Sequence, residues 1–306
     1  MTFADAITGY FLEKRRNFSV HTVEDYQRTF RRFAAHVGAI DVAAITPTHV
    51  RSFLNQMIDA ERAAKTVANA WIALSSFWTW AEHELEIPHI IRDRVACPDW
   101  KSPAIQPYTA EELSALLAAC ANGRAWATRR GGAIRSARPN ALRERAIIIT
   151  LVDTGLRAQE LCDLTIANYN DKTGALLVLH GKNDKQRLVY CGVTARTTIW
   201  TYLVSRPDAR PTHPLFATHN NTHILTDNLL NSIQRIADVA GVKNATIHRF
   251  RHTFAITFLR NGGSVLALQA LLGHERMETV RIYAKLAQID LQQAQRNASP
   301  ADNWRL

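Results

Sequence analysis

The chain has 306 residues, of which 47% are hydrophobic and 21% are charged, and this balance is typical of a folded protein with room for two domains. Its net charge of +10 and pI of about 9.8 favour a polyanionic partner, with nucleic acid as the first candidate. The apolar run 146–152 is too short to span a membrane, and the N-terminus has its acidic residue before its basic ones, unlike a secretory signal. We therefore expect a cytoplasmic protein without a membrane partner.

The cysteines lie too far apart in the sequence for a zinc-binding or compact disulfide framework. We expect all four to be buried thiols in a reducing compartment. They are Cys97, Cys120, Cys162 and Cys191.

Residues 1–100 predict a helical domain. In 19–38, apolar residues recur at helical spacing, Thr22 and Asp25 resemble a capping box, and Gly38 ends the pattern. A further helix is predicted to start with Thr46 as N-cap and Pro47 as its first residue. The aromatic stripe within 65–85 is more typical of a core than of a base-stacking surface. The basic residues on the other faces are either solvated or face DNA; those that we predict to contact DNA are Arg28, Arg31, Arg51 and Lys65.

Residues 101–108 form a proline-containing stretch without periodicity, which predicts a linker between domains at 1–100 and 109–306. Thr109 and Glu112 then predict the capping box of a new helix. The arginine- and glycine-rich segment 121–140 predicts a mobile loop. It either grips phosphates, with Arg129 and Arg130 as the candidates, or is a solvated insertion.

Residues 140–156 predict an apolar helix. Two β-type runs, 175–179 and 187–191, flank a polar turn and predict a hairpin, after which the pattern is helical to the end. The expected fold class is therefore mainly α with a small β-sheet.

Several residues of the second domain can carry chemistry, although each alone has an ordinary explanation as a cap, a solvated turn residue or a core tyrosine. Arginine forks, a lysine, histidines and a phenol are the groups that bind phosphate and move protons near it. In chain order they are Arg157, Lys182, His248, Arg251, His274 and Tyr283.

His248 and His252 have the spacing of two metal ligands on one helix face. Their neighbours are Arg249 and Arg251, with no carboxylate between the histidines, so a phosphate suits the charge better than a cation does. We expect no metal and no other cofactor.

In order and spacing, the set resembles the tyrosine recombinase, or phage integrase, family. The matching strings are TGLRAQEL at 154–161, GKNDKQR at 181–187, HRFRHTFA at 248–255, LLGH at 271–274 and the tyrosine at 283. The resemblance is strong over 107–290 and looser over 1–100, where the family has a helical core-binding domain. Two departures are Lys285, where many relatives carry histidine, and the 121–140 segment, which is longer than expected.

The resemblance implies that Tyr283 is a nucleophile that attacks a DNA phosphorus without metal. His248 is expected to assist proton transfer at the tyrosine, and Lys182 to protonate the leaving 5′-oxygen. The product is a 3′-phosphotyrosine link, and repeated strand exchange passes through a Holliday junction.

The resemblance also implies that Arg157 and Arg251 hold the phosphate oxygens and stabilise the transition state, with His274 adding a hydrogen bond. Glu160 is expected to support the site. Further expected DNA contacts in this domain are Lys185, Arg187 and Arg249.

As partners the resemblance implies duplex DNA with paired recombination sites and a homotetramer, or a heterotetramer with a second recombinase. An accessory DNA-bending protein is a further candidate, and residues 287–306 are a candidate docking tail. The two domains are expected to form a C-shaped clamp around DNA.

The alternative functions are a type IB topoisomerase or telomere resolvase, and a DNA-binding regulator without catalysis. The sequence leaves open the target site and the biological role: integration, excision, inversion, dimer resolution or transposition.

Overall fold

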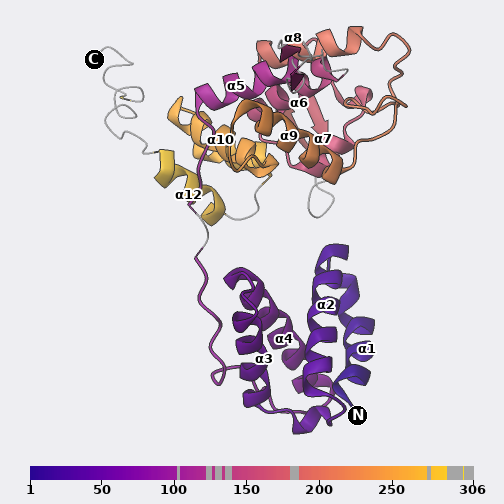
Figure 1. The fold of residues 1–306 in the computed structure, drawn as a ribbon, viewed down its shortest axis with the longest axis vertical. Coiled ribbons are helices and arrows are strands. Elements are labelled where there is room, and N and C mark those ends of the chain that lie inside the picture. The colour runs from indigo at the N-terminus through magenta and orange to yellow at the C-terminus, as the bar shows by residue number, and fades with distance from the viewer. Residues whose placement is uncertain are drawn as a thin grey trace. The chain divides into compact units, whose positions relative to one another are not determined.

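The computed structural model divides the chain into two compact units, Met1–Ala104 and Ile105–Leu306 (Figure 1). It describes residues 1–101, 104–121, 126–127, 133–134, 140–179, 186–273, 277–287 and 299. The units meet in the sequence within the predicted linker 101–108. No helix among the described residues is long and apolar enough to cross a bilayer.

Unit 1 is helical, as predicted. Its elements are α1 (Phe3–Lys14), α2 (Val20–Val37), α3 (Pro47–Asp59) and α4 (Ala64–Glu84), with 3₁₀ turns at Arg15–Asn17 and Val42–Ala44.

The helix ends of unit 1 follow the predicted signals except at the start of α2. Gly38 ends α2 with a φ of 71°, and Thr46 caps α3 with Pro47 as its first residue, both as predicted. The predicted cap at Thr22 is wrong, because the side chain of Ser19 accepts a hydrogen bond from the Thr22 amide and begins the helix three residues earlier.

The core of unit 1 is built on aromatic rings. Phe3 is fully buried, and its ring contacts those of Phe30, Phe33, Phe77 and Trp78, with centroids 4.6–6.0 Å apart. Phe77 and Trp78 belong to the predicted aromatic stripe of α4, so the core interpretation of that stripe is confirmed.

Unit 2 is mainly helical, with short strands. Its helices are α5 (Ala110–Ala121), α6 (Ala141–Thr154), α7 (Ala158–Asp163), α8 (Val193–Val204), α9 (Thr226–Ala240), α10 (Ile247–Arg260), α11 (Val265–Leu272) and α12 (Met277–Ala287), with a 3₁₀ turn at Ile166–Asn168. The predicted box is present before α5, where the Thr109 amide donates to Glu112 and the Glu112 amide donates to Thr109.

The predicted hairpin is present as β3 (Ala175–Val178) and β4 (Arg187–Tyr190), which pair antiparallel with Leu176 opposite Val189. Its turn, residues 180–185, lies outside the described residues. Within the predicted loop 121–140, β1 (Trp126–Ala127) and β2 (Ala133–Ile134) also pair antiparallel. Most of that loop, and the prediction that it is mobile, lies outside the described residues.

The cysteines correct one prediction. Cys120, Cys162 and Cys191 are buried, but Cys97 is exposed, because it lies on an irregular segment after α4 that no helix covers. Burial raises the pKa of Cys162 and of Cys191 to about 12, so both thiols stay protonated and unreactive at neutral pH.

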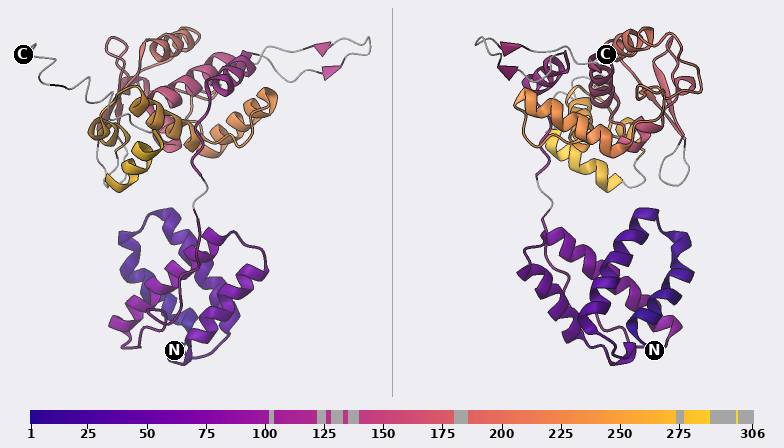
Figure 2. Two further views of the ribbon diagram at one scale, coloured as in Figure 1. Left: turned by 90° about the vertical axis from the view of Figure 1, so that its left-hand side faces the viewer. Right: turned by 45° about the vertical axis from the view of Figure 1, so that its right-hand side comes forward.

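α10 is the central helix of the part of unit 2 that carries the candidate residues. It packs against α6, α11 and α12, as the two views of Figure 2 show. α6 ends at Gly155, which has a φ of 64° in the left-handed region. A β-carbon built there would lie 2.5 Å from Phe254 Cδ1 on α10 and 2.9 Å from Leu272 Cδ2 on α11. The absence of a side chain therefore lets three helices meet next to Arg157.

Gly155→Ala is expected to lower the unfolding free energy of unit 2 by about 2–4 kcal/mol, from left-handed strain plus overpacking. The matched control is Gly241→Ala, since Gly241 has a φ of 71° with no atom within 4 Å of a built β-carbon. The control should lose only about 1 kcal/mol. Urea unfolding of the full chain measures both, and equal losses would contradict the close packing described here.

Candidate active site

Glu160 is a buried carboxylate in the first turn of α7, where the chain leaves Gly155. The Arg157 amide donates to Glu160 Oε2 at 2.9 Å, and Arg157 Nη1 donates to Oε1 at 2.7 Å. The carboxylate therefore caps α7 and at the same time fixes the Arg157 side chain, which is 35% exposed. This leaves a guanidinium that is both anchored and open to solvent.

Arg187, the first residue of β4, binds the other side of the same carboxylate. Its Nη1 and Nη2 donate to Glu160 Oε1 and Oε2 at 2.8 and 2.7 Å, and its Nε donates to the Leu271 carbonyl at 2.8 Å. Glu160 thus connects α7, the β3–β4 hairpin and, through Arg187, the end of α11. In the sequence, the predicted Lys182 lies between β3 and β4, outside the described residues.

The charge state of Glu160 follows from these partners. Burial alone would raise the pKa of this carboxyl, but hydrogen bonds from Arg187 and Arg157, together with the Arg187 charge, outweigh burial and lower the pKa to about 2. Glu160 is therefore ionised at neutral pH, and its one negative charge neutralises only one of the two positive charges of Arg157 and Arg187.

Arg251 is 3% exposed and lies in the second turn of α10. Its Nη1 donates to the Gly155 carbonyl and its Nη2 to the Leu272 carbonyl, each at 2.7 Å. Burial and the neighbouring Arg157 lower its pKa to about 10, so it remains charged at neutral pH. Arg251 therefore joins the ends of α6 and α11 and adds a buried positive charge beside the partly exposed Arg157.

Tyr283 lies on α12 and is 5% exposed. Its phenol oxygen is 3.0 Å from His252 Nδ1, and the two ring centroids are 5.7 Å apart. Burial raises the pKa of Tyr283, although Arg251 and Arg157 act in the opposite direction. The phenol is thus protonated at neutral pH and close enough to both arginines for their charges to affect it.

His248 and His252 lie one turn apart on α10, with ring centroids 5.8 Å apart. Burial lowers the pKa of both histidines. The charges of Arg251 and Arg157 lower the pKa of His248 further, and those of His248 and Arg251 lower the pKa of His252. Both rings are therefore neutral at pH 7, in the state that can accept a proton.

Unit 2 therefore brings together four of the six residues predicted to be catalytic, namely Arg157, His248, Arg251 and Tyr283, and the supporting residue Glu160. Lys182 and His274 lie outside the described residues, as do the predicted DNA contacts Arg129, Arg130 and Lys185.

The remaining predicted DNA contacts fall into two groups. The side chains on unit 1 are exposed and remain candidates: Arg28, Arg31, Arg51 and Lys65. Arg187 and Arg249 instead bind within unit 2. Arg249 pairs with Glu112, donates to the carbonyls of Gln106 and Lys243, and lies over the Tyr108 ring. These internal contacts show that both arginines stabilise the fold of unit 2, because they fix segments next to α10 and α7. Contact of either arginine with DNA stays a prediction.

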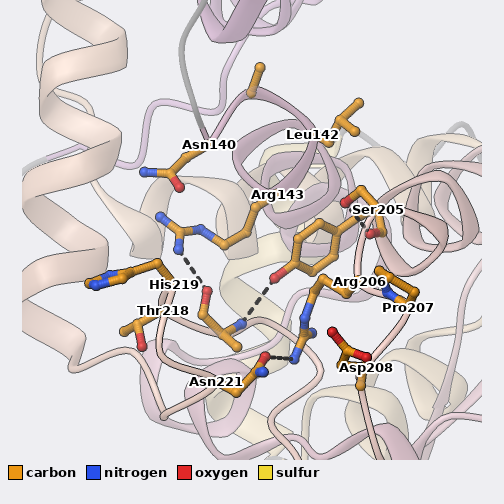
Figure 3. Close-up of a pocket in the computed structure, with 14 residues that line it drawn as sticks. Asn140, Leu142, Arg143, Ser205, Arg206, Pro207, Asp208, Thr218, His219 and Asn221 are labelled. Carbon is orange, nitrogen blue, oxygen red and sulfur yellow. Dashed lines mark hydrogen bonds between the residues drawn. The ribbon is translucent and has the colours of Figure 1, made fainter.

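A separate hollow of about 560 Å³ lies at the N-terminal end of α6 (Figure 3). Arg157 follows the opposite, C-terminal end of that helix. Arg143 donates to the Ala217 carbonyl in the hollow, and Arg206 donates to Asn221 Oδ1, so these arginines hold the loop between α8 and α9. None of the four described catalytic candidates lines this hollow.

Among the described residues there is no group of three or more histidine, cysteine, aspartate or glutamate side chains arranged to hold a metal ion.

Two family models match the chain. The model of the phage integrase family matches residues 108–289, and that of the phage integrase N-terminal SAM-like domain matches residues 7–85. The curated relatives include tyrosine recombinase XerD of Listeria monocytogenes, 25% identical over 95% of this chain and 96% of the relative. They also include tyrosine recombinase XerC of Pelobacter propionicus, 30% identical over 94% and 92% of the two chains.

A solved structure of the Tn1549 transposon integrase with circular intermediate DNA has a TM-score of 0.76 to this chain. It is 17% identical and covers 92% of this chain and 94% of its own. At this identity the likeness supports the shared fold.

Two features of the site were not assigned from the sequence. His252 was considered only as a metal ligand, although its position next to Arg251 and four residues after His248 puts it on the same helix face. Arg187 was predicted only to contact DNA, and nothing in its local sequence indicates that a carboxylate 27 residues away will bind it.

Glu160 is expected to make unit 2 sensitive to acid. Because its folded pKa is lowered, its contribution to stability is present above the unfolded pKa of about 4.5 and is lost as pH falls towards 2; this contribution is about 3 kcal/mol. Glu160→Gln should therefore lower the unfolding free energy at pH 7 by about 3–5 kcal/mol, since Arg187 loses its buried partner. The difference from wild type should shrink between pH 4.5 and 2.

Urea unfolding at several pH values checks this expectation, with Glu278→Gln as the control at an exposed position of the same unit. A Glu160→Gln effect as small as that of the control, or one that does not change with pH, would contradict the buried ion-pair assignment.

Proposed function

Because the chain belongs to the phage integrase family, we propose how its residues cut and rejoin DNA, with Tyr283 as the nucleophile. The chain is a site-specific tyrosine recombinase, an enzyme that acts on DNA. Its phenol oxygen attacks a phosphorus of the DNA backbone and forms a 3′-phosphotyrosine link. This link conserves the energy of the broken phosphodiester bond, so a new 5′-hydroxyl can rejoin the strand without another source of energy.

The observation that supports this assignment is the convergence of Arg157, Arg251 and Tyr283. The two guanidinium charges lie close enough to the phenol to lower its pKa against the effect of burial. A pentacoordinate phosphorane carries more negative charge than the phosphate from which it forms, and fixed cations that need not reorganise stabilise that charge most. Arg157 and Arg251 supply two such cations, and Glu160 holds the first of them in place.

The remaining roles are assigned by the family pattern. Lys182, which lies between β3 and β4 in the sequence, protonates the leaving 5′-oxygen, and His274 donates a hydrogen bond to a non-bridging phosphate oxygen. His248, which lies close enough to Arg251 and Arg157 for their charges to affect it, assists proton transfer at the tyrosine. All three assignments rest on the family pattern.

We also propose that the active assembly is a tetramer on two paired DNA sites, with strand exchange through a Holliday junction. Two curated relatives are named XerC and XerD, and a structural neighbour is a transposon integrase, so resolution of dimers and movement of a mobile element are both candidate roles. The tail after α12 is proposed to dock on a neighbouring subunit, and an accessory DNA-bending protein is a further candidate partner. The enzyme is proposed to act on the nucleoid in the prokaryotic cytoplasm.

Covalent trapping tests the nucleophile. Labelled DNA from the flanks of the protein's own gene, nicked so that religation is blocked, is mixed with protein and run on a denaturing gel. Wild type should give a shifted covalent band, and Tyr283→Phe should give none, because the phenylalanine ring has no oxygen to bond to phosphorus.

The matched control is Tyr190→Phe, at an exposed tyrosine of the same unit, which should keep the band. A band that survives in Tyr283→Phe would refute the nucleophile assignment. Relaxation of supercoiled DNA without strand exchange would favour the topoisomerase alternative. Tight binding with no band in any protein would favour the regulator.

Non-specific DNA binding should weaken steeply with salt, because phosphate contacts release counterions. Arg28→Gln and Arg31→Gln, at exposed positions of α2, should each reduce the magnitude of the slope of log K against log salt by about 1. Fluorescence anisotropy across a salt series measures this, and unchanged slopes in both variants would remove these arginines from the DNA interface.

A further inference from the structure

The hydrogen bond between His252 and Tyr283 gives the phenol a neighbour that the family pattern used above does not assign. Oη and Nδ1 are 3.0 Å apart, and the rings come from two helices, α12 and α10, which pack against each other. A proton acceptor must lie at about 2.6–3.2 Å from the proton donor, so this pair meets the distance requirement before any DNA binds.

We propose that His252 accepts the phenol proton of Tyr283 as the phenol oxygen attacks the DNA phosphorus. The proposal rests on the proposed function, since it assigns a further catalytic residue to the same reaction. It moves the proton transfer at the tyrosine, which the family pattern gives to His248, to His252 one turn along α10.

The proton balance of this step is closed by groups already named. The Oη–P bond forms while the P–O5′ bond breaks, the phenol proton passes to Nδ1 of His252, and Lys182 gives a proton to the departing 5′-oxygen. In the rejoining step the new 5′-hydroxyl attacks phosphorus and gives its proton to Lys182, which lost one during cleavage, while the P–Oη bond breaks and His252 returns its proton to the phenol.

The surroundings of His252 favour the acceptor state. The charged and titratable groups that face it among the described residues are His248 and Arg251 on α10 and Tyr283 on α12. Burial, His248 and the Arg251 cation oppose a positive charge on the ring, so the ring is neutral, and with hydrogen on Nε2 its Nδ1 can accept a hydrogen bond from the phenol. When the phosphorane forms, its negative charge offsets the cost of a protonated His252.

The packing around Tyr283 fixes the phenol beside His252. Tyr283 belongs to a buried apolar cluster with Ala255, Leu268, Leu272 and Val280. A phenol that is buried in such a cluster benefits from a fixed hydrogen-bond partner at its polar end.

The first test uses the full chain without DNA, so it does not depend on recombination. Histidine side chains are labelled with ¹⁵N and titrated by NMR in wild type and in Tyr283→Phe. Loss of the phenol should raise the pKa of His252 by about 0.5 to 1, the size expected for one hydrogen bond to the neutral ring. The pKa of His248 should stay unchanged. An unchanged pKa of His252 would overturn the proposal.

The second test measures the rate of covalent complex formation on nicked DNA between pH 5.5 and 8.5. In wild type the rate should fall at low pH, because a protonated His252 cannot accept the phenol proton. His252→Asn keeps a polar atom near the Nδ1 position but cannot take up a proton. It should react about 100-fold more slowly and lose the fall at low pH. A fluorinated, more acidic tyrosine at position 283 should restore part of the lost rate, which a merely misfolded variant would not show.

His248→Asn is the matched control and should keep the fall at low pH. The opposite pattern, with the fall lost in His248→Asn and kept in His252→Asn, would assign the proton to His248 and overturn the proposal, as would a fluorotyrosine that restores nothing. Absence of covalent product in wild type would refute the proposed function and the catalytic role of His252 with it, and the NMR titration would still report separately on the hydrogen bond.

Discussion

The candidate active site depends on one buried carboxylate. Glu160 has two oxygens, and each accepts hydrogen bonds from guanidinium groups that come from different elements, Arg157 before α7 and Arg187 at the start of β4. A single negative charge between two positive charges leaves the cluster with a net positive charge, which Arg251 increases. This excess of positive charge favours binding of an anion, and we propose that a DNA phosphate is that anion.

The same contacts fix the backbone around the site. Arg251 donates hydrogen bonds to the carbonyls at the ends of α6 and α11, so the floor of the site is set by backbone geometry. Tyr283, the proposed nucleophile, lies on α12, is 5% exposed and hydrogen-bonds to His252. The phenol is therefore held by packing as well as by this hydrogen bond.

Much of this arrangement could be predicted from the sequence, for identifiable reasons. Helical periodicity, the capping box at Thr109 and Glu112, Pro47 and Gly38 are local signals, and the structure confirms them. The family-like strings brought together residues that lie more than a hundred positions apart. What the sequence did not reveal depends on non-local contacts. Arg187 and Arg249 are basic residues of the type that binds DNA, but in the structure they pair with carboxylates from other elements. Cys97 is exposed because no helix covers its segment, and Ser19 rather than Thr22 caps α2.

The most direct test of the account asks whether Arg157 acts by neutralising charge on the phosphate. The rate of covalent product formation is measured for wild type and Arg157→Ala on two nicked DNA duplexes, one with a normal scissile phosphate and one with an uncharged methylphosphonate there. On the phosphate, Arg157→Ala should be slower than wild type by about 10²–10³-fold. On the methylphosphonate, which has no charge to neutralise, the difference should nearly vanish. An equal loss on both duplexes would show that Arg157 maintains the fold of the site and does not stabilise the reacting phosphate.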